Sequence, residues 1–414
     1  MDRLSVQACI VGGGPAGMMA GLLFARAGLT VAVLEKHADF LRDFRGDTIH
    51  PSTLDVMEEL GLRRAFLALP HRKVATLSAV VGTESFRVAD FRHLPTRNRF
   101  IALMPQWDFL DFLAERGRRY PGFRLLMEAE AIELIEAGAR VTGVRARTPG
   151  GLLEVSADLV IGADGRHSLV RARSGFEPQD YGAPMDVLWF SLPRHPRDTD
   201  ATAGRFGRGR ILVTLDRGDY WQCAFVVPKG GDAALRALGL AQFREAVASL
   251  APFLRDRVGE IRDWDCVKLL TVRVDRLKRW HRPGLLCIGD AAHAMSPLGG
   301  VGINLAIQDA VAAANLLTAP LKAGRPAEAD LARVQARRMP PTRWTQGLQR
   351  LVQNRVIARV LDTAGTPLRP PLALRLLDRV PPLQRLPARL VGLGFRPEHV
   401  AVAEVPLPQA VAPP

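Results

Sequence analysis

The segment from Val6 to Leu34 constrains the fold most, because it has the pattern of strand, glycine turn, helix and strand. Apolar residues occupy positions 6–11, glycines recur between 12 and 17, a helical stretch extends to 27, and a second apolar run covers 29–34. Two short apolar runs on either side of a helical stretch are typical of a βαβ unit in a parallel sheet. We therefore predict an α/β domain at the N-terminus.

The glycine turn has the Gly-x-Gly-x-x-Gly spacing of a dinucleotide-binding motif, supplied by Gly12, Gly14 and Gly17. The first glycine permits a tight turn, the second lets the backbone approach a pyrophosphate, and the third lets the helix pack on the strand. Amides at the helix N-terminus then bind the phosphates. Glu35 ends the second strand, where a carboxylate accepts hydrogen bonds from ribose hydroxyls.

Length and composition indicate a two-domain globular protein. The chain has 414 residues, 48% of them hydrophobic and 24% charged, and a single core rarely grows beyond about 250–300 residues. Four isolated cysteines without a Cys-x-x-Cys pair indicate free thiols in a reducing compartment. The N-terminus has no secretory signal pattern and no transmembrane helix is expected, so we predict a cytoplasmic location.

The positive charge of the chain is concentrated at one end. The net charge is +14, and residues 323–414 contain 14 arginines, no lysine and 6 acidic residues. These arginines alternate with leucines instead of stacking aromatic residues, and no nucleic-acid motif is present. We therefore predict no nucleic-acid partner. The histidines and cysteines show no metal-ligand spacing, so no metal site is predicted.

The remaining patterns alternate between two kinds of sheet. Residues 75–88 and several segments between 187 and 227 have the alternation and the β-branched and aromatic content of an antiparallel sheet. We predict an α/β (α+β overall) fold of three parts: a discontinuous Rossmann-like domain with a parallel sheet (1–74, 101–180 and 271–320), an interleaved antiparallel-sheet domain (75–100 and 181–270), and a C-terminal basic helical region (321–414).

Two further motifs indicate which dinucleotide the first domain binds. Gly289-Asp290 ends an apolar strand and is followed by the glycine loop 297–304 and a long Ala-rich helix. Asp290 is placed to bind the ribityl hydroxyls of a flavin, and the helix start stabilises negative charge on a reduced flavin ring. Asp164-Gly165 ends another apolar strand.

With these three motifs in this order, the chain resembles the group A flavoprotein monooxygenases, the class of para-hydroxybenzoate and ubiquinone-precursor hydroxylases. The resemblance extends from Val6 to about Leu317. It implies that the first domain binds FAD and that the antiparallel-sheet domain binds substrate. No second dinucleotide domain is visible in the sequence, so NADH or NADPH would bind transiently.

The resemblance also implies roles for individual residues. Gly12, Gly14, Gly17 and Glu35 would hold the ADP half of FAD, Asp290 and the loop through Asn304 the flavin half, and the Asp164-Gly165 segment would serve FAD and NAD(P)H together. Arg45 and Gln106 stand where relatives contact the FAD phosphates and ribityl chain, although Arg45 has a surface arginine as its alternative. The full predicted cofactor-binding set is Gly12, Gly14, Pro15, Ala16, Gly17, Glu35, Lys36, Arg45, Gln106, Asp164, Gly165, Ser168, Arg171, Gly289, Asp290, Pro297, Gly300, Val301, Gly302, Ile303 and Asn304.

The reaction that we predict is hydroxylation of an aromatic or quinone-like small molecule. NAD(P)H would reduce FAD, O₂ would add to the ring at C4a, and the resulting hydroperoxide would pass one oxygen atom to the substrate. No side chain is assigned a catalytic role, because the flavin carries the chemistry; Pro297, Gly299 and Gly300 would line the flavin loop. His293 is interpreted as a structural part of its loop. Trp189, Trp221 and Phe225 are candidates for the substrate wall, with sheet core as the alternative.

Two other functions stay open at this point. A halogenase or dehydrogenase could have the same fold, although the Trp-x-Trp-x-Ile-Pro segment usual in such halogenases is missing. A flavin-binding protein without catalysis is the third hypothesis. The sequence is compatible with a monomer or a homodimer.

The basic tail allows two interpretations. Leucines between 372 and 390 alternate with Arg369, Arg375, Arg379, Arg385 and Arg389. Such a helix could lie on an anionic membrane surface, or it could pack its leucines on the folded domain with the arginines in solvent. We favour packing, the usual fate of amphipathic helices, and keep peripheral membrane contact as the alternative.

Overall fold

The βαβ unit forms where the glycine motif predicts it. In the computed structural model, which describes residues 2–41, 48–198, 202–207, 209–363 and 368–406, it comprises β1 (Asp2–Val11), α1 (Pro15–Arg26) and β2 (Val31–Leu34). Proline suits the first turn of α1, since the amide that it lacks has no partner within the helix. β1 and β2 pair in parallel, with Val11 opposite Leu34.

Among the described residues, the larger sheet has eight strands in the order β19-β20-β11-β1-β2-β8, with β10 and β9 continuing from β11. The pairs β20–β11, β11–β1, β1–β2 and β2–β8 are parallel. The carboxyl ends of these strands therefore lie along one edge. The further strands are β8 (Phe123–Leu126), β9 (Glu130–Ala137), β10 (Arg140–Thr148), β11 (Gly151–Gly162), β19 (His281–Arg282) and β20 (Leu285–Cys287).

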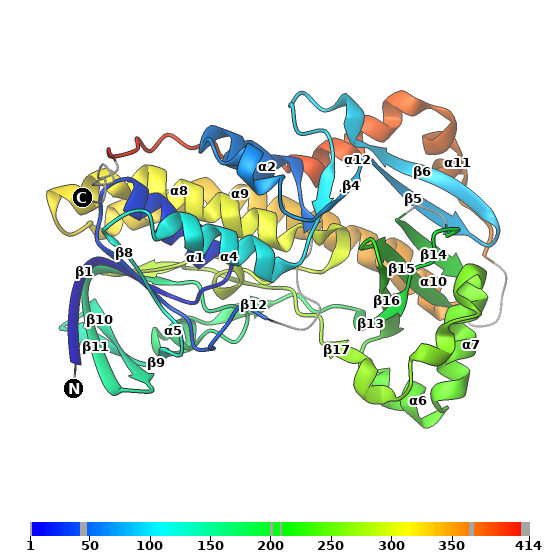
Figure 1. Ribbon diagram of the computed structural model, residues 1–414, viewed down its shortest axis with the longest axis horizontal. Helices are drawn as coiled ribbons and strands as arrows, with labels where there is room; N and C mark the ends of the chain where they lie inside the picture. The colour runs from blue at the N-terminus through cyan, green and yellow to red at the C-terminus, as the bar shows by residue number, and fades with distance from the viewer. Residues whose placement is uncertain (1, 42–47, 199–201, 208, 364–367, 407–414) are drawn as a thin grey trace, which may run out of the picture.

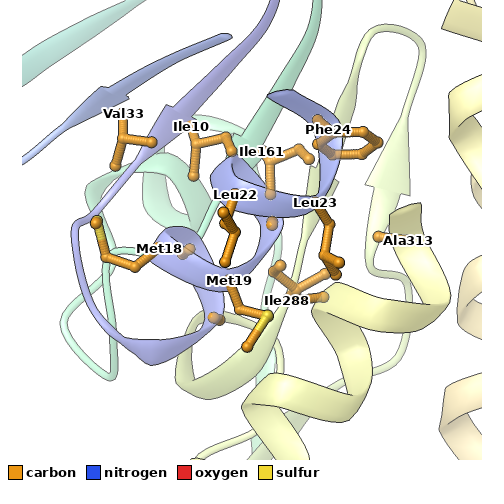
Figure 2. Packing of buried hydrophobic residues seen from close by; sticks show 14 of the residues in the cluster. Ile10, Met18, Met19, Leu22, Leu23, Phe24, Val33, Ile161, Ile288 and Ala313 are labelled. Atoms are coloured by element: carbon orange, nitrogen blue, oxygen red, sulfur yellow. The ribbon is translucent and has the colours of Figure 1, made fainter. Parts of the chain in front are cut away.

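Helix α1 is buried on nearly all sides, because it lies between the parallel sheet and the long helix α8. Figure 2 shows Met19, Leu23 and Phe24 of α1 among side chains that include Ile288 and Ala313. Replacing a fully buried leucine of such a core by alanine costs about 2–5 kcal/mol. The helices of this part are α2 (Pro51–Glu59), α3 (Arg63–Phe66), α4 (Gln106–Gly117), α5 (Leu169–Arg173), α8 (Gly302–Ala323) and α9 (Glu328–Val352).

The second sheet lies at the other end of the elongated molecule (Figure 1), with seven strands among the described residues in the order β17-β13-β16-β15-β14-β5-β6. Helices α6 and α7 lie beside it, and α7 covers one of its faces. The strands and helices are β5 (Thr76–Val81), β6 (Glu84–Asp90), β13 (Met185–Pro193), β14 (Ala203–Gly207), β15 (Arg210–Asp216), β16 (Tyr220–Pro228), β17 (Lys268–Leu270), α6 (Asp232–Ala237) and α7 (Leu240–Leu250).

Two small sheets connect these parts. One has the order β3-β7-β4 and the other pairs β12 with β18. Their strands are β3 (Thr48–Ile49), β4 (Arg72–Val74), β7 (Ile101–Leu103), β12 (Pro178–Asp180) and β18 (Asp275–Leu277).

The C-terminal region is helical, and its last described segment returns to the first domain. After α10 (Ala358–Asp362), α11 (Leu372–Arg379) and α12 (Pro381–Gly392) pack on β6. The segment 393–406 then runs back beside α2 toward α1 (Figure 1), where Arg26 donates to the carbonyl of Val402 and the backbone N–H of Val405 donates to the carbonyl of Arg26.

The predicted fold class is confirmed, with parallel and antiparallel sheets interleaved along the chain and a helical C-terminus. The domain boundaries stay a prediction. Among the described residues, one helix with its preceding turn, Leu298–Ala323, is long and apolar enough to cross a bilayer, but 78% of its apolar window is buried inside the protein. It is the core helix α8.

Candidate functional site

The three sequence motifs meet at one edge of the parallel sheet. Val11 pairs with Gly162 and with Leu34, and Gly162 pairs with Cys287. The residues that follow these strand ends are therefore neighbours, although they come from positions near 12, 35, 163 and 288. Several of them are partly exposed next to fully buried strands, as a ligand-binding edge requires.

Glycines at this edge allow the motifs to touch. Gly12 has φ +106°, and a Cβ there would lie 2.4 Å from the carbonyl oxygen of Ala163. A Cβ on Gly289 would lie 3.1 Å from the Cβ of Ala16 on α1 and 3.4 Å from that of Ala306 on α8. The Gly-Asp turn is thus wedged between the starts of two helices.

The other two glycines of the first motif differ in what surrounds them. A Cβ on Gly17 would lie 1.9 Å from the carbonyl oxygen of Gly12, so α1 packs directly on the turn. A Cβ on Gly14 would meet no atom within 4 Å. Gly14 is the N-cap of α1, no side chain among the described residues caps this helix, and its first turn has no acidic residue. The amides of α1 therefore face space that a phosphate can occupy.

Glu35 lies beside the glycine turn, as the motif predicts. Its carboxylate is buried and accepts hydrogen bonds from the backbone N–H groups of Gly13 and His37, both at 3.0 Å. These bonds fix the carboxylate at the end of β2, next to the start of α1. Lys36, which follows it, is exposed.

The start of α8 has the same character as the start of α1. Val301 precedes it, no side chain in the described part of the chain caps it, and its first turn has no acidic residue. The turn before it bends through Gly299 and Gly300, with φ of +75° and +63°. The partial positive charge of this helix end is available to an anionic or electron-rich group.

Asn304 has a role that the sequence did not indicate. Its Oδ1 accepts hydrogen bonds from the backbone N–H of His50 at 2.9 Å and from the Thr53 hydroxyl at 2.7 Å. Its Nδ2 donates to the carbonyls of Thr48 and Gly300, both at 3.2 Å. The side chain thus joins the start of α8 to the segment between β3 and α2, and all of these groups are satisfied within the protein.

His50 is held at the same junction. It is fully buried, and its Nδ1 lies 2.7 Å from the carbonyl oxygen of Val391 on α12. Its Nε2 is buried without a hydrogen-bond partner among the described residues. Burial lowers the pKa of His50 from 6.5 to about 4, against the opposing effect of the Val391 carbonyl. The imidazole is therefore neutral at pH 7.

Asp290 keeps part of its side chain accessible at the edge of the sheet. Among the described residues, its carboxylate accepts a hydrogen bond from Arg166 alone, whose Nη2 lies 3.4 Å from Oδ2. The carboxylate therefore has accepting capacity for ligand hydroxyls. Arg166 does not belong to the cofactor-binding set predicted from the sequence, although it directly follows Asp164-Gly165.

The polar side chains of the Asp164-Gly165 loop, which follows β11, point inward and hold the loop in shape. Asp164 accepts hydrogen bonds from the Ser168 hydroxyl at 2.5 Å and from the backbone N–H of Val170 at 3.1 Å. Burial raises the pKa of the Asp164 carboxyl, and these hydrogen bonds oppose the shift. Arg171 pairs with the buried Asp275 at 3.2 Å. These side chains hold the loop, which leaves Gly165 and its backbone at the edge.

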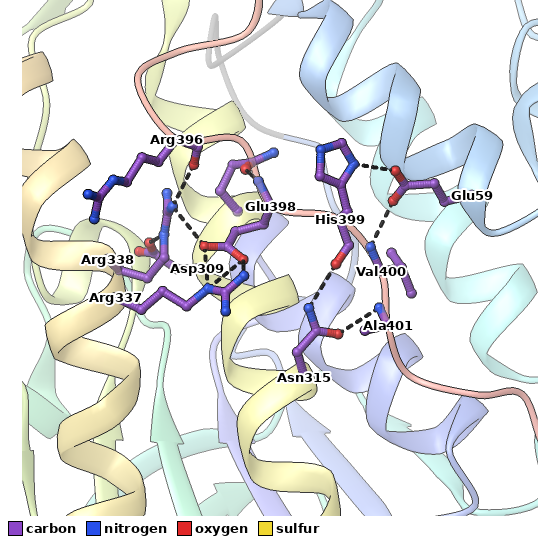
Figure 3. A network of polar contacts seen from close by, with 11 residues as sticks. Glu59, Asp309, Asn315, Arg337, Arg338, Arg396, Glu398, His399, Val400 and Ala401 are labelled. Carbon is purple, nitrogen blue, oxygen red and sulfur yellow. Dashed lines mark hydrogen bonds and ion pairs between the residues drawn. The ribbon is translucent and has the colours of Figure 1, made fainter.

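A buried ionic network supports the Gly-Asp turn from behind. Asp309 on α8 accepts a hydrogen bond from the backbone N–H of Gly289 at 3.0 Å, and its Oδ2 lies 2.5 Å from Nε2 of His293. Arg338 on α9 pairs with Asp309 at 3.0 Å and with Glu398 at 3.3 Å. Figure 3 shows how Glu398 brings the C-terminal segment into this network. His293 is therefore a structural part of its loop.

The three aromatic candidates lie on opposite faces of the second sheet. Trp221 and Phe225 belong to the core on the face that α7 covers, where Trp221 donates to Asp198 at 2.9 Å and Phe225 packs edge-on against Phe243. This matches the core alternative for both. Trp189 lies on the other face, in the cluster that contains Leu298 of the flavin loop. Its indole N–H is buried without a partner among the described residues.

Of the two cofactor candidates that rest on single positions, Arg45 and Gln106, the structure describes only Gln106. Arg45 lies outside the described residues. Gln106 is the first residue of α4 and is partly buried.

The hydrogen-bond donors and acceptors at this edge suit FAD. Two uncapped helix starts can receive its pyrophosphate and the electron-rich edge of its ring, and the carboxylates of Glu35 and Asp290 stand beside them to accept hydrogen bonds from ribose and ribityl hydroxyls. The fold and this site define a flavin-dependent oxidoreductase.

Comparison with known proteins supports the assignment as a flavin-dependent oxidoreductase. Residues 5–343 match the family described as "FAD binding domain". The chain is 33% identical to 6-methylpretetramide 4-monooxygenase of Streptomyces rimosus over 383 residues, covering 92% of this chain and 90% of that one. It is 26% identical to 3-demethoxyubiquinol 3-hydroxylase of Escherichia coli, covering 77% and 81%. The solved structure of OxyS anhydrotetracycline hydroxylase from Streptomyces rimosus is similar in fold, with a TM-score of 0.75 at 23% identity over 95% of this chain and 77% of that one.

The chain therefore belongs to the FAD binding domain family of group A flavoprotein monooxygenases. It is an FAD-dependent hydroxylase, with a small organic molecule and O₂ as its substrates.

Proposed function

We propose that the chain uses NADH or NADPH and O₂ to hydroxylate an aromatic or quinone-like small molecule. The substrate class is supported by the 33% identity over 92% of the chain to an enzyme named as a 6-methylpretetramide monooxygenase. The observation that carries the proposal is the position of Gly289, which brings the uncapped starts of α1 and α8 together beside Asp290.

In this proposal the bound FAD supplies hydride acceptance and oxygen activation, and the protein binds and orients it. Gly12, Gly14 and the first turn of α1 would hold the pyrophosphate, with Glu35 at the adenosine ribose. Asp290 would bind the ribityl hydroxyls, and the first turn of α8 would stabilise negative charge on the reduced ring. Asn304 would act as a positioning residue, because it fixes the β3–α2 segment against that turn.

The substrate would bind over the apolar face of the second sheet that includes Trp189. This face also holds Val187, Ile211 and Val226, and the cluster joins it to α10 and to Leu298 in the flavin loop. Apolar walls exclude water from the reacting atoms, which limits side reactions of the activated oxygen with water. The indole N–H of Trp189, which is buried and has no partner among the described residues, would donate to a phenol or quinone oxygen on the substrate.

The proposal is tested by measuring oxygen uptake with a panel of phenols, aromatic acids, quinols and fused-ring phenols, each with NADH and NADPH. A substrate should stimulate NAD(P)H oxidation and yield one hydroxylated product for each O₂ consumed. Product that requires halide would indicate a halogenase. Substrate oxidation without oxygen transfer would indicate a dehydrogenase, and reduced flavin that never turns over in oxygen would indicate a non-catalytic flavoprotein.

A further inference from the structure

Helices α11 and α12 expose leucines that an ordinary amphipathic helix would bury. Leu372 and Leu376 on α11 are 83% and 56% exposed, and Leu383 and Leu386 on α12 are 44% and 64% exposed. Helix α11 has no buried residue at all. The expectation that the tail packs its leucines on the folded domain is therefore wrong for these four.

The exposed leucines of each helix lie together on the outer side. Positions 372 and 376 are one turn apart, and so are 383 and 386, which places each pair on one helix face. The opposite side of α11 is fixed to the second sheet, since Asp378 accepts a hydrogen bond from the backbone N–H of Arg87 on β6 at 2.8 Å. The opposite side of α12 buries Gln384 and Ala388.

Arginines flank these leucines. Arg369, Arg375, Arg379, Arg385 and Arg389 are all exposed, and among the described residues only Arg375 forms an ion pair, with Glu84 at 3.5 Å. Asp378 is the sole acidic residue between positions 368 and 393. The four leucines and five arginines are called the leucine-arginine face below. It combines insertable apolar groups with a net positive charge.

We propose that the leucine-arginine face binds the surface of an anionic lipid bilayer. The leucines would enter the boundary between headgroups and acyl chains, while the arginines extend to the lipid phosphates. An acidic protein or a nucleic acid would be attracted by the arginines. Neither partner would explain why four leucines are exposed beside them, because exposed apolar groups do not contribute to a purely electrostatic contact.

The face is also close to the flavin loop. Val391, at the end of α12, accepts the hydrogen bond from His50, and a Cβ on Gly299 would lie 3.9 Å from a methyl carbon of Val391. A bilayer bound at α12 would therefore lie next to the candidate active site. An apolar aromatic substrate dissolved in the membrane would then reach the site without crossing water. This consequence of membrane binding rests on the proposed function.

Vesicle flotation with the full-length, FAD-loaded protein tests the face directly. Wild-type protein should float with vesicles of phosphatidylglycerol and phosphatidylcholine, and should not float with phosphatidylcholine alone. Because exposed charges are screened over about 8 Å at physiological ionic strength, added salt should weaken the binding. Flotation requires no turnover, so its outcome is independent of whether the proposed reaction is correct.

Matched variants separate the leucines from the arginines. Leu372→Gln/Leu386→Gln, which leaves the charge unchanged, and Arg379→Gln/Arg385→Gln should each lower the vesicle partition coefficient by about tenfold or more. The control is Leu238→Gln at the end of α6, where the leucine is 55% exposed, and it should bind like wild type. Unchanged thermal unfolding would show that every variant is folded.

Three results would overturn the proposal: no flotation of the wild type with anionic vesicles, equal flotation of Leu372→Gln/Leu386→Gln and Leu238→Gln, or loss of binding in the arginine variant alone. The last would reveal a purely electrostatic contact, as expected for an acidic protein or nucleic-acid partner.

Discussion

The guanidinium Nε of Arg338 on α9 lies 3.0 Å from Oδ1 of Asp309 on α8, and both side chains are almost fully buried. Through the other carboxylate oxygen, Asp309 also holds the amide of Gly289 in the Gly-Asp turn. The charge pair therefore connects the packing of α8 and α9 to the loop that is predicted to hold the flavin.

Replacing Arg338 by methionine should destabilise the protein strongly, because it leaves Asp309 and Glu398 buried with fewer opposite charges. Breaking one partner of a buried ion pair costs about 3–5 kcal/mol. Urea unfolding of the apoprotein measures this loss. Arg333→Met on the same helix is the control, since Arg333 is exposed and pairs with Asp330 at 3.8 Å, and it should cost less than about 1 kcal/mol. Equal losses in the two variants would contradict the account.

The free energy of unfolding should fall as the pH is lowered, because His50 is protonated more readily in the unfolded chain than in the folded protein. Burial lowers the pKa of His50 in the folded state from 6.5 to about 4, so the unfolded chain takes up a proton at a higher pH than the folded protein. Its contribution is complete above pH 6.5 and is lost as the pH falls toward 4, by about 3 kcal/mol in total. Unfolding free energies of wild type and His50→Gln between pH 7 and pH 4 should diverge accordingly. Parallel pH profiles would show that His50 does not titrate in this range.

Gly14→Ala should separate folding from cofactor binding. A Cβ at Gly14 meets no atom within 4 Å, and its φ of −74° suits alanine. The apoprotein should therefore keep its stability within about 0.5 kcal/mol. The methyl group would occupy the proposed pyrophosphate space and should weaken FAD binding by about tenfold or more, which fluorescence titration of the apoprotein measures. Gly347→Ala on α9, where a Cβ is also free of contacts, should leave FAD affinity unchanged.

The sequence predicts those parts of the site that depend on residues close together in the chain. Gly12, Gly14 and Gly17 lie between a strand and a helix, so their backbone roles follow from spacing alone. Asn304 and His50 could not be interpreted in this way, because their partners are 254 and 341 residues away in the chain.

The strands of the fold show the same limit. β-Branched and aromatic residues between 187 and 227 indicate strands, whereas β14 lacks this signal because two of its five residues are glycines. β14 pairs in parallel with the distant β5, a contact without a local signal. Alternation along β13 and β16 could not reveal which face is the core, because both faces are apolar. Only the packing of α7 distinguishes Trp221 from Trp189.

The two tryptophans should respond in opposite ways to replacement by phenylalanine. Trp189→Phe removes an indole N–H that has no partner among the described residues, so folding should be unaffected while KM for the hydroxylated substrate rises. Trp221→Phe leaves the buried Asp198 without one of its donors, which should cost about 1–3 kcal/mol of stability with little change in KM. Steady-state kinetics and urea unfolding of both variants provide the comparison. A rise in KM for Trp221→Phe alone would place the substrate on the other face of the sheet.

The most direct test of the central claim, that this chain transfers oxygen from O₂ to an organic substrate on FAD, is mass spectrometry of the product formed under ¹⁸O₂. With a substrate found by oxygen uptake, the account predicts one ¹⁸O atom in each product molecule and none from H₂¹⁸O. Product without ¹⁸O from O₂, or reduction of all the oxygen to hydrogen peroxide, would contradict it.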